Sequence, residues 1–199
     1  KKNYRADIID RNGNYIVKTV SSIDIGINPV EVIDKKRLLI NLQLIFPNKD
    51  YSEIKKKLNK KKFFYLEKKI SAINYEKIML LGDKSIKPEE KLTRIYPQKN
   101  LFSHIIGQID SDNNGISGIE KSFDEKLKFI KEPLMLTVDA DIQFLVREEL
   151  KKFISIFQGK GGTAILMDVN NGEVISMVSY PDFNLNERVT INDQNYINR

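Results

Sequence analysis

The stretch LTVDADIQFLVREELKKFISIFQGKGGTAILMDVNNGEVISMVSYPDF, residues 136–183, decides the fold class. Its first half repeats apolar residues at intervals of three, four and seven, which predicts a long amphipathic helix over residues 140–157 with a buried stripe. The stripe comprises Ile142, Leu145, Val146, Phe153, Ile154 and Phe157. Two β-branched runs, 163–169 and 174–179, then flank Asn170-Asn171-Gly172, which predicts a β-hairpin. A long helix followed by an antiparallel hairpin indicates an α+β protein.

The N-terminal sequence predicts another hairpin. Ile8 and Ile9 precede a short polar segment, and an apolar, β-branched run resumes over residues 15–20. The pair Asn12-Gly13 between them favours a tight turn, because glycine accepts the positive φ that such a turn requires.

Three helices are predicted between residues 34 and 82. The first is capped by Asp34 and ends before Pro47, and its core side carries Leu38, Leu39, Leu42 and Ile45. The second is rich in lysine and starts at Ser52 as its cap. The third covers residues 71–81, ends at Gly82, and is expected to bury Ile73, Ile78 and Leu81. These helices are predicted to form a small mixed lobe.

The sequence after this lobe alternates short elements with turns. We expect extended structure over residues 91–97, a short helix or turn over 101–106, and turns over 107–118, which are rich in Asp, Asn and Gly. A fourth helix is predicted from Ile119, because Phe123 and Leu127 recur at helical spacing. Residues 182–199 are predicted to form an irregular loop.

The 199 residues carry a formal net charge of +6, and much of the basic charge is lysine within residues 55–69. No zinc-ligand set, basic repeat or aromatic-interleaved arginine patch accompanies these lysines, so the pattern does not indicate nucleic-acid binding. It favours a solvated helix face. A lipid-headgroup or cell-wall surface is the partner that would best fit the surplus charge.

The chain has no cysteine and one histidine, His104. A disulfide framework and a thiolate metal site are therefore excluded, and we expect neither a metal nor a cofactor. The apolar runs fall well short of the roughly 18 residues that a membrane span needs. Because the sequence opens at Lys1 in strand-like residues, we expect a membrane anchor upstream of it.

Five segments, in this order, resemble the signatures of the class B penicillin-binding proteins over residues 5–199. They are RADIIDRNG (5–13), RIYP (94–97), HIIG with GISGIEKSFD (104–107 and 115–124), LTVDADIQ (136–143), and residues 162–184. Each is short, but their shared order and spacing make the resemblance specific. Ala6 stands where the family usually has glycine, and the ten or so residues between Leu127 and Thr137 replace a longer strand-rich segment of many relatives.

The resemblance implies an elongated α+β pedestal over residues 1–135, followed over residues 136–199 by the start of a transpeptidase domain. The short segment 107–118 favours the division-specific branch of the family. In relatives the serine nucleophile comes shortly after the position of Arg199, so no catalytic residue is expected here. The residues to which the resemblance gives structural or interface roles are Arg5, Asp10, Arg11, Gly13, Arg94, Tyr96, Pro97, Gly107, Gly118 and Glu120.

The expected function is therefore a non-catalytic scaffold of a protein that cross-links septal peptidoglycan at the periplasmic face of the bacterial inner membrane. In such a protein a serine is acylated by the D-alanyl-D-alanine end of a peptide stem, and β-lactams mimic that donor. The implied partners are the protein's own transpeptidase domain, a membrane glycosyltransferase of division and other division proteins. Three arrangements are open for the hairpin of residues 163–179: it is unpartnered and mobile, it packs on the helix before it, or it forms a homodimer through its edges.

Two alternatives come from other classes. Ser52-Glu53-Ile54-Lys55 and Ser111-Asp112-Asn113 match two short patterns of serine acyl-transferases, so an autonomous hydrolase or transferase using Ser52 and Lys55 is the first. No Lys-Thr-Gly follows either match, which favours a helix cap and a turn. The second alternative is a polyanion-binding module that uses the lysine-rich helix.

Glu120 lies between apolar Ile119 and Phe123, and a carboxylate there is costly to bury without a partner. We hypothesise an ion pair from Glu120 to Arg5, Arg11 or Arg94. Asp139 and Asp141 could act as an acid–base pair, but carboxylates at a helix start are ordinarily structural. His104 is likewise expected to be structural, either packed or bound in a turn.

Overall fold

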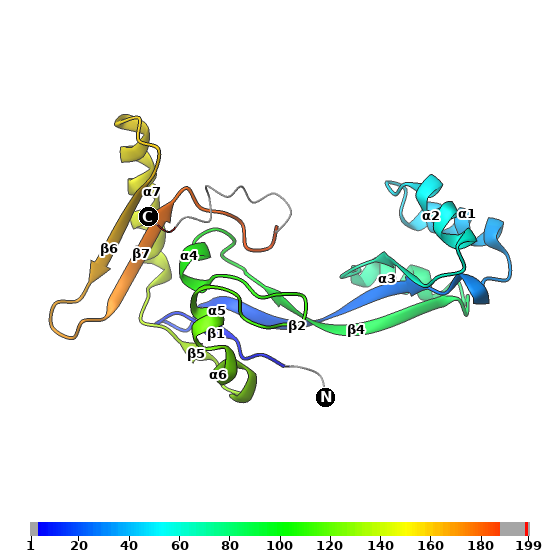
Figure 1. Cartoon of the computed structure of the whole chain (residues 1–199), viewed down its shortest axis with the longest axis horizontal. Coiled ribbons are helices and arrows are strands. Elements are labelled where there is room, and N and C mark those ends of the chain that lie inside the picture. The colour runs from blue at the N-terminus through cyan, green and yellow to red at the C-terminus, as the bar shows by residue number, and fades with distance from the viewer. Residues whose placement is uncertain (1–3, 188–197, 199) are drawn as a thin grey trace. The chain divides into compact units, whose positions relative to one another are not determined.

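Two strands, β2 (Tyr15–Ile27) and β4 (Ile86–Ile95), each run from one compact part of the chain into another. Unit 1 comprises Lys1–Val20 and Arg94–Arg199, and unit 2 comprises Ser21–Thr93. The structure is a computed structural model that describes residues 4–187 and 198 (Figure 1). Both units contain helices and strands, so the α+β prediction is confirmed.

The predicted N-terminal hairpin is present in unit 1. Strand β1 (Ile8–Ile9) pairs antiparallel with β2, with Ile8 opposite Val17, and the turn between them has Gly13 at φ +86°. On its other side β1 pairs in parallel with β5 (Leu134–Met135). The core beside these strands includes Ala6, Ile8, Ile16, Val17, Phe102, Ile106 and Leu127.

Three short helices follow β4 in unit 1. They are α4 (Ser103–Ile106), α5 (Gly118–Ser122) and α6 (Asp124–Phe129). The single helix predicted from Ile119 is therefore wrong in extent, because the helix breaks at Phe123, which ends α5 and begins α6. The helical spacing still predicted which residues face the core, since Leu127 is fully buried, and Ile119 and Phe123 are partly buried and pack against the same core cluster.

The long helix and the hairpin of residues 136–183 are α7 (Ala140–Ile156), β6 (Gly162–Met167) and β7 (Val174–Tyr180). The hairpin packs on α7, mainly through β7 (Figure 1). The predicted buried stripe is wrong for three of its members, because Leu145, Phe153 and Phe157 are more than half exposed, and the other three, Ile142, Val146 and Ile154, are only partly buried. The hairpin covers only one side of α7, whereas the apolar sequence pattern extends around a wider arc.

Unit 2 is the predicted mixed lobe. Its elements are η1 (Pro29–Glu31), α1 (Lys35–Ile45), α2 (Tyr51–Asn59), β3 (Phe64–Glu67) and α3 (Ala72–Met79). Strand β3 pairs antiparallel with the end of β2, and the helices bury a separate core around Ile25, Ile27, Leu38, Leu42, Ile54, Leu58 and Ile78. Asp34 caps α1 by accepting from the backbone N–H groups of Lys36 and Arg37, as predicted.

Three details of unit 2 differ from the prediction. The cap of α2 is Asp50, not Ser52, because its carboxylate accepts from the N–H groups of Ser52 and Glu53. Ile73 is exposed, since α3 turns its Ile78 side toward the core. Strand β3 was not expected, and β4 begins five residues before the predicted extended segment.

The predicted loop over residues 182–199 is described only in part. Residues 182–187 are irregular as expected, with Phe183 and Leu185 buried in the core of unit 1, and all but residue 198 of the rest lie outside the described residues. None of the described helices has the length and apolarity required to span a lipid bilayer.

Candidate functional site: a buried arginine–glutamate network

Glu120 lies on α5 with no solvent exposure and accepts hydrogen bonds from two arginines. Its Oε2 accepts from Arg5 Nε at 2.6 Å, and its Oε1 accepts from Arg94 Nε at 3.0 Å. Arg5 is also fully buried, and Arg94 is nearly so. The hypothesised ion pair of Glu120 is thus present with two of the three candidate arginines.

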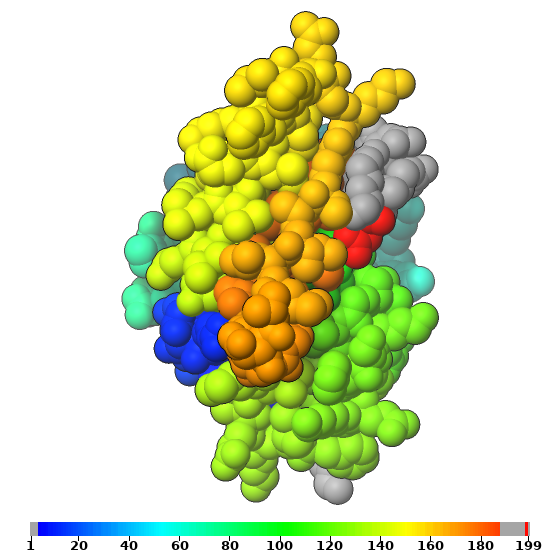
Figure 2. All heavy atoms as spheres, turned by 90° about the vertical axis from the view of Figure 1, so that its left-hand side faces the viewer, coloured from blue at the N-terminus to red at the C-terminus, as the bar shows by residue number. Residues whose placement is uncertain are grey.

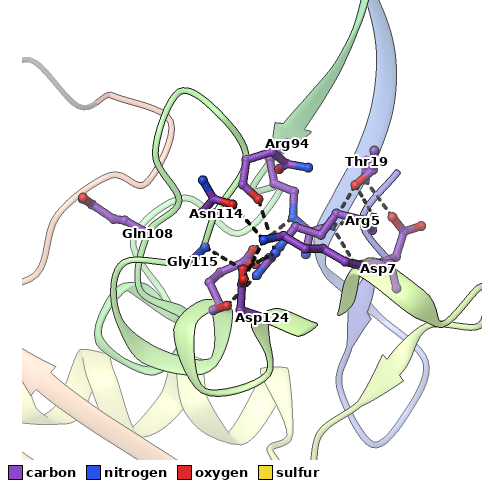
Figure 3. A network of polar contacts seen from close by, with 12 residues as sticks. Arg5, Asp7, Thr19, Arg94, Gln108, Asn114, Gly115 and Asp124 are labelled. Carbon is purple, nitrogen blue, oxygen red and sulfur yellow. Dashed lines mark hydrogen bonds and ion pairs between the residues drawn. The ribbon is translucent and has the colours of Figure 1, made fainter. Parts of the chain in front are cut away.

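The other nitrogen atoms of Arg5 are also satisfied. Its Nη1 donates to Asp124 Oδ1 at 2.7 Å, and its Nη2 donates to the Glu120 carbonyl oxygen. Two carboxylates therefore balance the two guanidinium groups, which offsets the cost of removing these charges from water. Figure 3 shows Arg5 and Arg94 converging with Asp124 beside the loop at Gly115.

Arg94 binds the backbone of the N-terminal segment. Its Nη1 donates to the carbonyl oxygens of Arg5 at 3.0 Å and Ala6 at 2.6 Å, and to Thr19 Oγ1 at 2.7 Å. The Thr19 hydroxyl in turn donates to the Arg5 carbonyl (Figure 3). The network therefore fixes four chain segments of unit 1 to one another: residues before β1, β2, the end of β4, and α5.

Asp124 at the start of α6 completes the network and holds a loop. Its Oδ1 accepts from the Gly115 N–H at 2.7 Å, and its Oδ2 accepts from Lys128 Nζ at 2.6 Å. Burial alone would raise the pKa of the Asp124 carboxyl, but the hydrogen bonds from Lys128, Gly115 and Arg5 outweigh it and lower the pKa to about 2.

This depressed pKa makes the stability of unit 1 depend on pH. The contribution of Asp124 is complete above its ordinary pKa of 3.8 and is lost as the pH falls through about 2, because the unfolded chain then binds a proton that the folded chain resists. We expect Asp124→Asn to flatten the fall in unfolding free energy between these pH values by up to about 2 kcal/mol. Urea unfolding of the unaltered chain and the Asp124→Asn variant across this pH range measures the difference. If the unfolding free energies of the two chains fell equally with pH, the prediction would be contradicted.

Two of the predicted glycines allow the backbones around α4 and α5 to touch. Gly107 has φ +73°, and a Cβ there would lie 2.2 Å from the Ser117 carbonyl oxygen. Gly118 has φ +58°, and a Cβ there would lie 2.6 Å from the Ile105 carbonyl oxygen. Since both contacts are with backbone, no side-chain movement relieves them, and this close approach brings α5 and Glu120 against the arginines.

Asp10, another predicted residue, is a cap for two elements. Its Oδ1 accepts from the N–H groups of Asn12 and Asn14 in the turn, and its Oδ2 accepts from the Ala140 N–H at the start of α7. Burial alone would raise the pKa of Asp10, but the hydrogen bonds from Asn14, Ala140 and Asn12 lower it. The first signature segment is thereby fixed to the segment that leads into α7.

Arg11 does not join the network. Its Nη2 binds Glu173 Oε2 at 3.1 Å in a pair that is more than a third exposed, so little stability is expected from it. Tyr96 is buried, and its backbone N–H and carbonyl both bond the side-chain amide of Asn186, whereas Pro97 is exposed. Asn186 lies in the irregular segment after β7 and carried no sequence signal.

Gln143 is a buried residue whose structural role the sequence did not reveal. Its Nε2 donates to the carbonyl oxygens of Leu101 and Met177, and its Oε1 accepts from Ser176 Oγ at 2.7 Å and the Met177 N–H at 2.9 Å. One amide thus joins α7, β7 and the segment before α4. The feature of the sequence that could have revealed this role is a polar residue directly after Ile142 within the apolar helix pattern.

The residues proposed for catalysis have structural roles. The Ser52 hydroxyl donates to Asp50 Oδ1, its helix cap, and no hydrogen bond joins Ser52 to Lys55 among the described residues. Hydrogen bonds from Ser52 and from the Glu53 backbone lower the pKa of Asp50, which makes it a poor proton acceptor. Ser111 to Asn113 form a turn in the other unit, as predicted.

The remaining candidate groups are also structural. Asp139 caps α7, and hydrogen bonds from the Ile142 N–H and the Asn12 side chain lower its pKa. The His104 ring packs edge-on against Phe183, with 5.4 Å between ring centroids. Residues 4–187 and 198 contain no group of three His, Cys, Asp or Glu side chains arranged to hold a metal ion.

Comparison with known proteins agrees with this geometry. A family model described as the penicillin-binding protein dimerisation domain matches residues 1–167. The probable peptidoglycan D,D-transpeptidase FtsI of Caulobacter vibrioides is 26% identical, and the alignment covers 98% of this chain and 34% of that protein. Peptidoglycan D,D-transpeptidase FtsI of Escherichia coli strain K12 is 28% identical, over 92% of this chain and 36% of its own length.

The chain therefore spans about a third of the length of these curated relatives. Among solved structures, penicillin-binding protein PBP2 from Helicobacter pylori superposes with a TM-score of 0.68 at 20% identity, covering 100% of this chain and 48% of that one. The fold is thus shared, and the resemblance seen in the five sequence segments is confirmed. The chain belongs to the penicillin-binding protein family, and its residues 1–167 match the dimerisation, or pedestal, region of that family.

Proposed function

We propose that this chain is the non-catalytic pedestal of a division-type class B penicillin-binding protein and holds a transpeptidase domain in place. The observation that carries the proposal is the continuous bonding of the signature segments in unit 1. Glu120 joins Arg5 and Arg94, Asp10 joins the N-terminal turn to α7, and Gln143 joins α7 to β7. A region that holds another domain in place needs its segments fixed to one another in this way. None of these groups is placed for catalysis.

Exposed large apolar residues of α7 and β6 support the same role. They are Phe144, Leu145, Phe153 and Ile156 of α7, Phe157 directly after it, and Ile165, Leu166 and Met167 of β6. Figure 2 shows α7 in yellow and the hairpin in orange on one face of the molecule. Strand β6 pairs only with β7 among the described strands, so it also has an open edge. Further strands of a transpeptidase domain would cover both features.

In this proposal residues 1–135 are the pedestal and residues 136–199 begin the transpeptidase domain. The complete protein forms an acyl-enzyme on a serine beyond Arg199 and cross-links septal peptidoglycan at the periplasmic face of the inner membrane. A division glycosyltransferase and other division proteins are its partners, and the roles of Arg11, Gly13 and Pro97 are structural or interfacial. The relatives are named as peptidoglycan D,D-transpeptidases, which supports this activity.

The apolar face gives a direct test. Phe153→Asp and Ile165→Asp should change the melting temperature of this chain little, because both side chains are more than half exposed. In the longer protein the same changes should bury a charge and lower both its melting temperature and its labelling by a fluorescent penicillin. Lys160→Asp, at an exposed polar position, serves as the control.

Equal, small effects of Phe153→Asp in both proteins would contradict the proposal. The competing arrangement is a homodimer of this chain through the β6 edge and the same apolar face. Sedimentation of the isolated chain distinguishes the two. A dimer that Ile165→Asp dissociates would show that a second copy covers the face.

A further inference from the structure

The net charge of the chain resides entirely in unit 2. Ser21–Thr93 contains 16 Lys and Arg residues against 10 Asp and Glu residues, which gives the formal charge of +6. The rest of the chain contains 17 basic and 17 acidic residues and is neutral. A neutral unit and a basic unit in one chain indicate that the basic one faces a negatively charged partner.

Exposed basic residues are concentrated in α2 and the turn that follows it, beside α1. The two helices are in contact, and Lys35 Nζ at the start of α1 donates to Asn59 Oδ1 at the end of α2 at 3.2 Å. Around this junction five exposed lysines have no ion pair among the described residues, namely Lys55, Lys56, Lys60, Lys61 and Lys62. By contrast, Lys57 is paired with Glu53. The unpaired charges are therefore available to a partner.

The outer face of α1 is also apolar. Ile33, Ile40 and Leu44 are 95%, 61% and 78% exposed. Ile33 directly precedes the Asp34 cap, whereas Ile40 and Leu44, four residues apart within α1, lie on the side of the helix opposite the buried Leu38 and Leu42. Helix α1 thus has a short exposed apolar stripe, Ile40 and Leu44, on the side away from the core of unit 2.

We infer that the outer surface of α1 and α2 binds the headgroup region of an anionic phospholipid bilayer. Isolated aliphatic side chains bordered by lysines are typical of helices that lie in a membrane interface, where the aliphatic groups enter the acyl boundary and the amines contact lipid phosphates. A soluble polyanion would use the lysines but leave Ile40 and Leu44 in water. The bilayer uses both features, so it is the occupant that the surface fits best.

The test is co-sedimentation of the whole chain with vesicles. Binding is expected to equimolar phosphatidylglycerol and phosphatidylethanolamine, to weaken as salt is added, and to be absent for phosphatidylcholine alone. The triple variant Lys55→Gln, Lys56→Gln, Lys60→Gln should reduce partitioning roughly 100-fold, at about 1 kcal/mol for each lysine. The matched control Lys121→Gln, Lys131→Gln, Lys160→Gln removes the same charge from exposed sites of unit 1 and should bind like the unaltered chain.

The apolar stripe is tested separately with Ile40→Ser, Leu44→Ser. Both positions are exposed, so the variant should fold normally, which its melting temperature checks, and partition roughly tenfold more weakly. Equal losses from the two lysine triples would overturn the inference, since net charge alone would then explain binding. Vesicle binding that survives the serine variant unchanged would overturn it too, as would no binding of the unaltered chain to anionic vesicles.

Discussion

Glu120→Ala is expected to lower the unfolding free energy of this chain by about 3–5 kcal/mol, because it leaves two buried guanidinium groups without their shared carboxylate. Arg5 retains Asp124, but Arg94 Nε loses its partner. The desolvation cost of both cations, which folding incurs in full, is then offset only in part. The loss should be a large fraction of the stability of a domain of this size.

Urea unfolding of unaltered and variant chains measures this loss. Glu125→Ala is the matched control, since it removes an exposed glutamate five residues away on α6, and it should cost less than about 0.5 kcal/mol. Glu120→Gln should fall between the two, because the amide keeps one acceptor but not the charge. A Glu120→Ala chain as stable as the Glu125→Ala chain would show that the network contributes nothing to folding.

Gln143→Leu is expected to cost about 3 kcal/mol or more, although leucine suits a helix and is apolar. The change leaves two donors, the Met177 N–H and the Ser176 hydroxyl, without the partner that Gln143 supplies. It does the same to two acceptors, the carbonyl oxygens of Leu101 and Met177. Each unsatisfied buried group costs about 1–3 kcal/mol. Hydrogen exchange should show which part opens. Amides of β6 and β7 should exchange faster, while those of α1 and α2 stay protected.

Gln98→Leu makes the same replacement at an exposed position and should leave exchange unchanged. If Gln143→Leu left the exchange of β7 as slow as in the unaltered chain, the amide would not be what fixes the hairpin to the rest of unit 1.

The ion network was largely predictable because its physics is local in sequence. A carboxylate next to Ile119 at a helical position must either find a cation or remain outside the core, and the two signature segments offered Arg5, Arg11 and Arg94. Choosing among the three required the fold, since Arg11 lies in the turn after β1 and meets Glu173 instead. Asp124 was missed because its bonds depend on the loop at Gly115.

Apolar periodicity predicted elements better than it predicted their environment. It placed α7 within one residue at its C-terminal end, but a stripe only says which face favours burial, not what covers it. The exposed Phe153 and Phe157 show the difference. Strand β3 was missed because its four residues lie between lysine clusters, and their pairing with β2 is a long-range contact that no local pattern reports.

The central claim is that these residues support a reaction whose serine lies elsewhere in the protein. Mass spectrometry of peptides after exposure to a penicillin tests it most directly, on both this chain and the longer protein. We expect no acylated peptide from residues 1–199 in either sample and one acylated serine downstream of Arg199 in the longer protein. Acylation of Ser52, abolished by Ser52→Ala, would contradict the account.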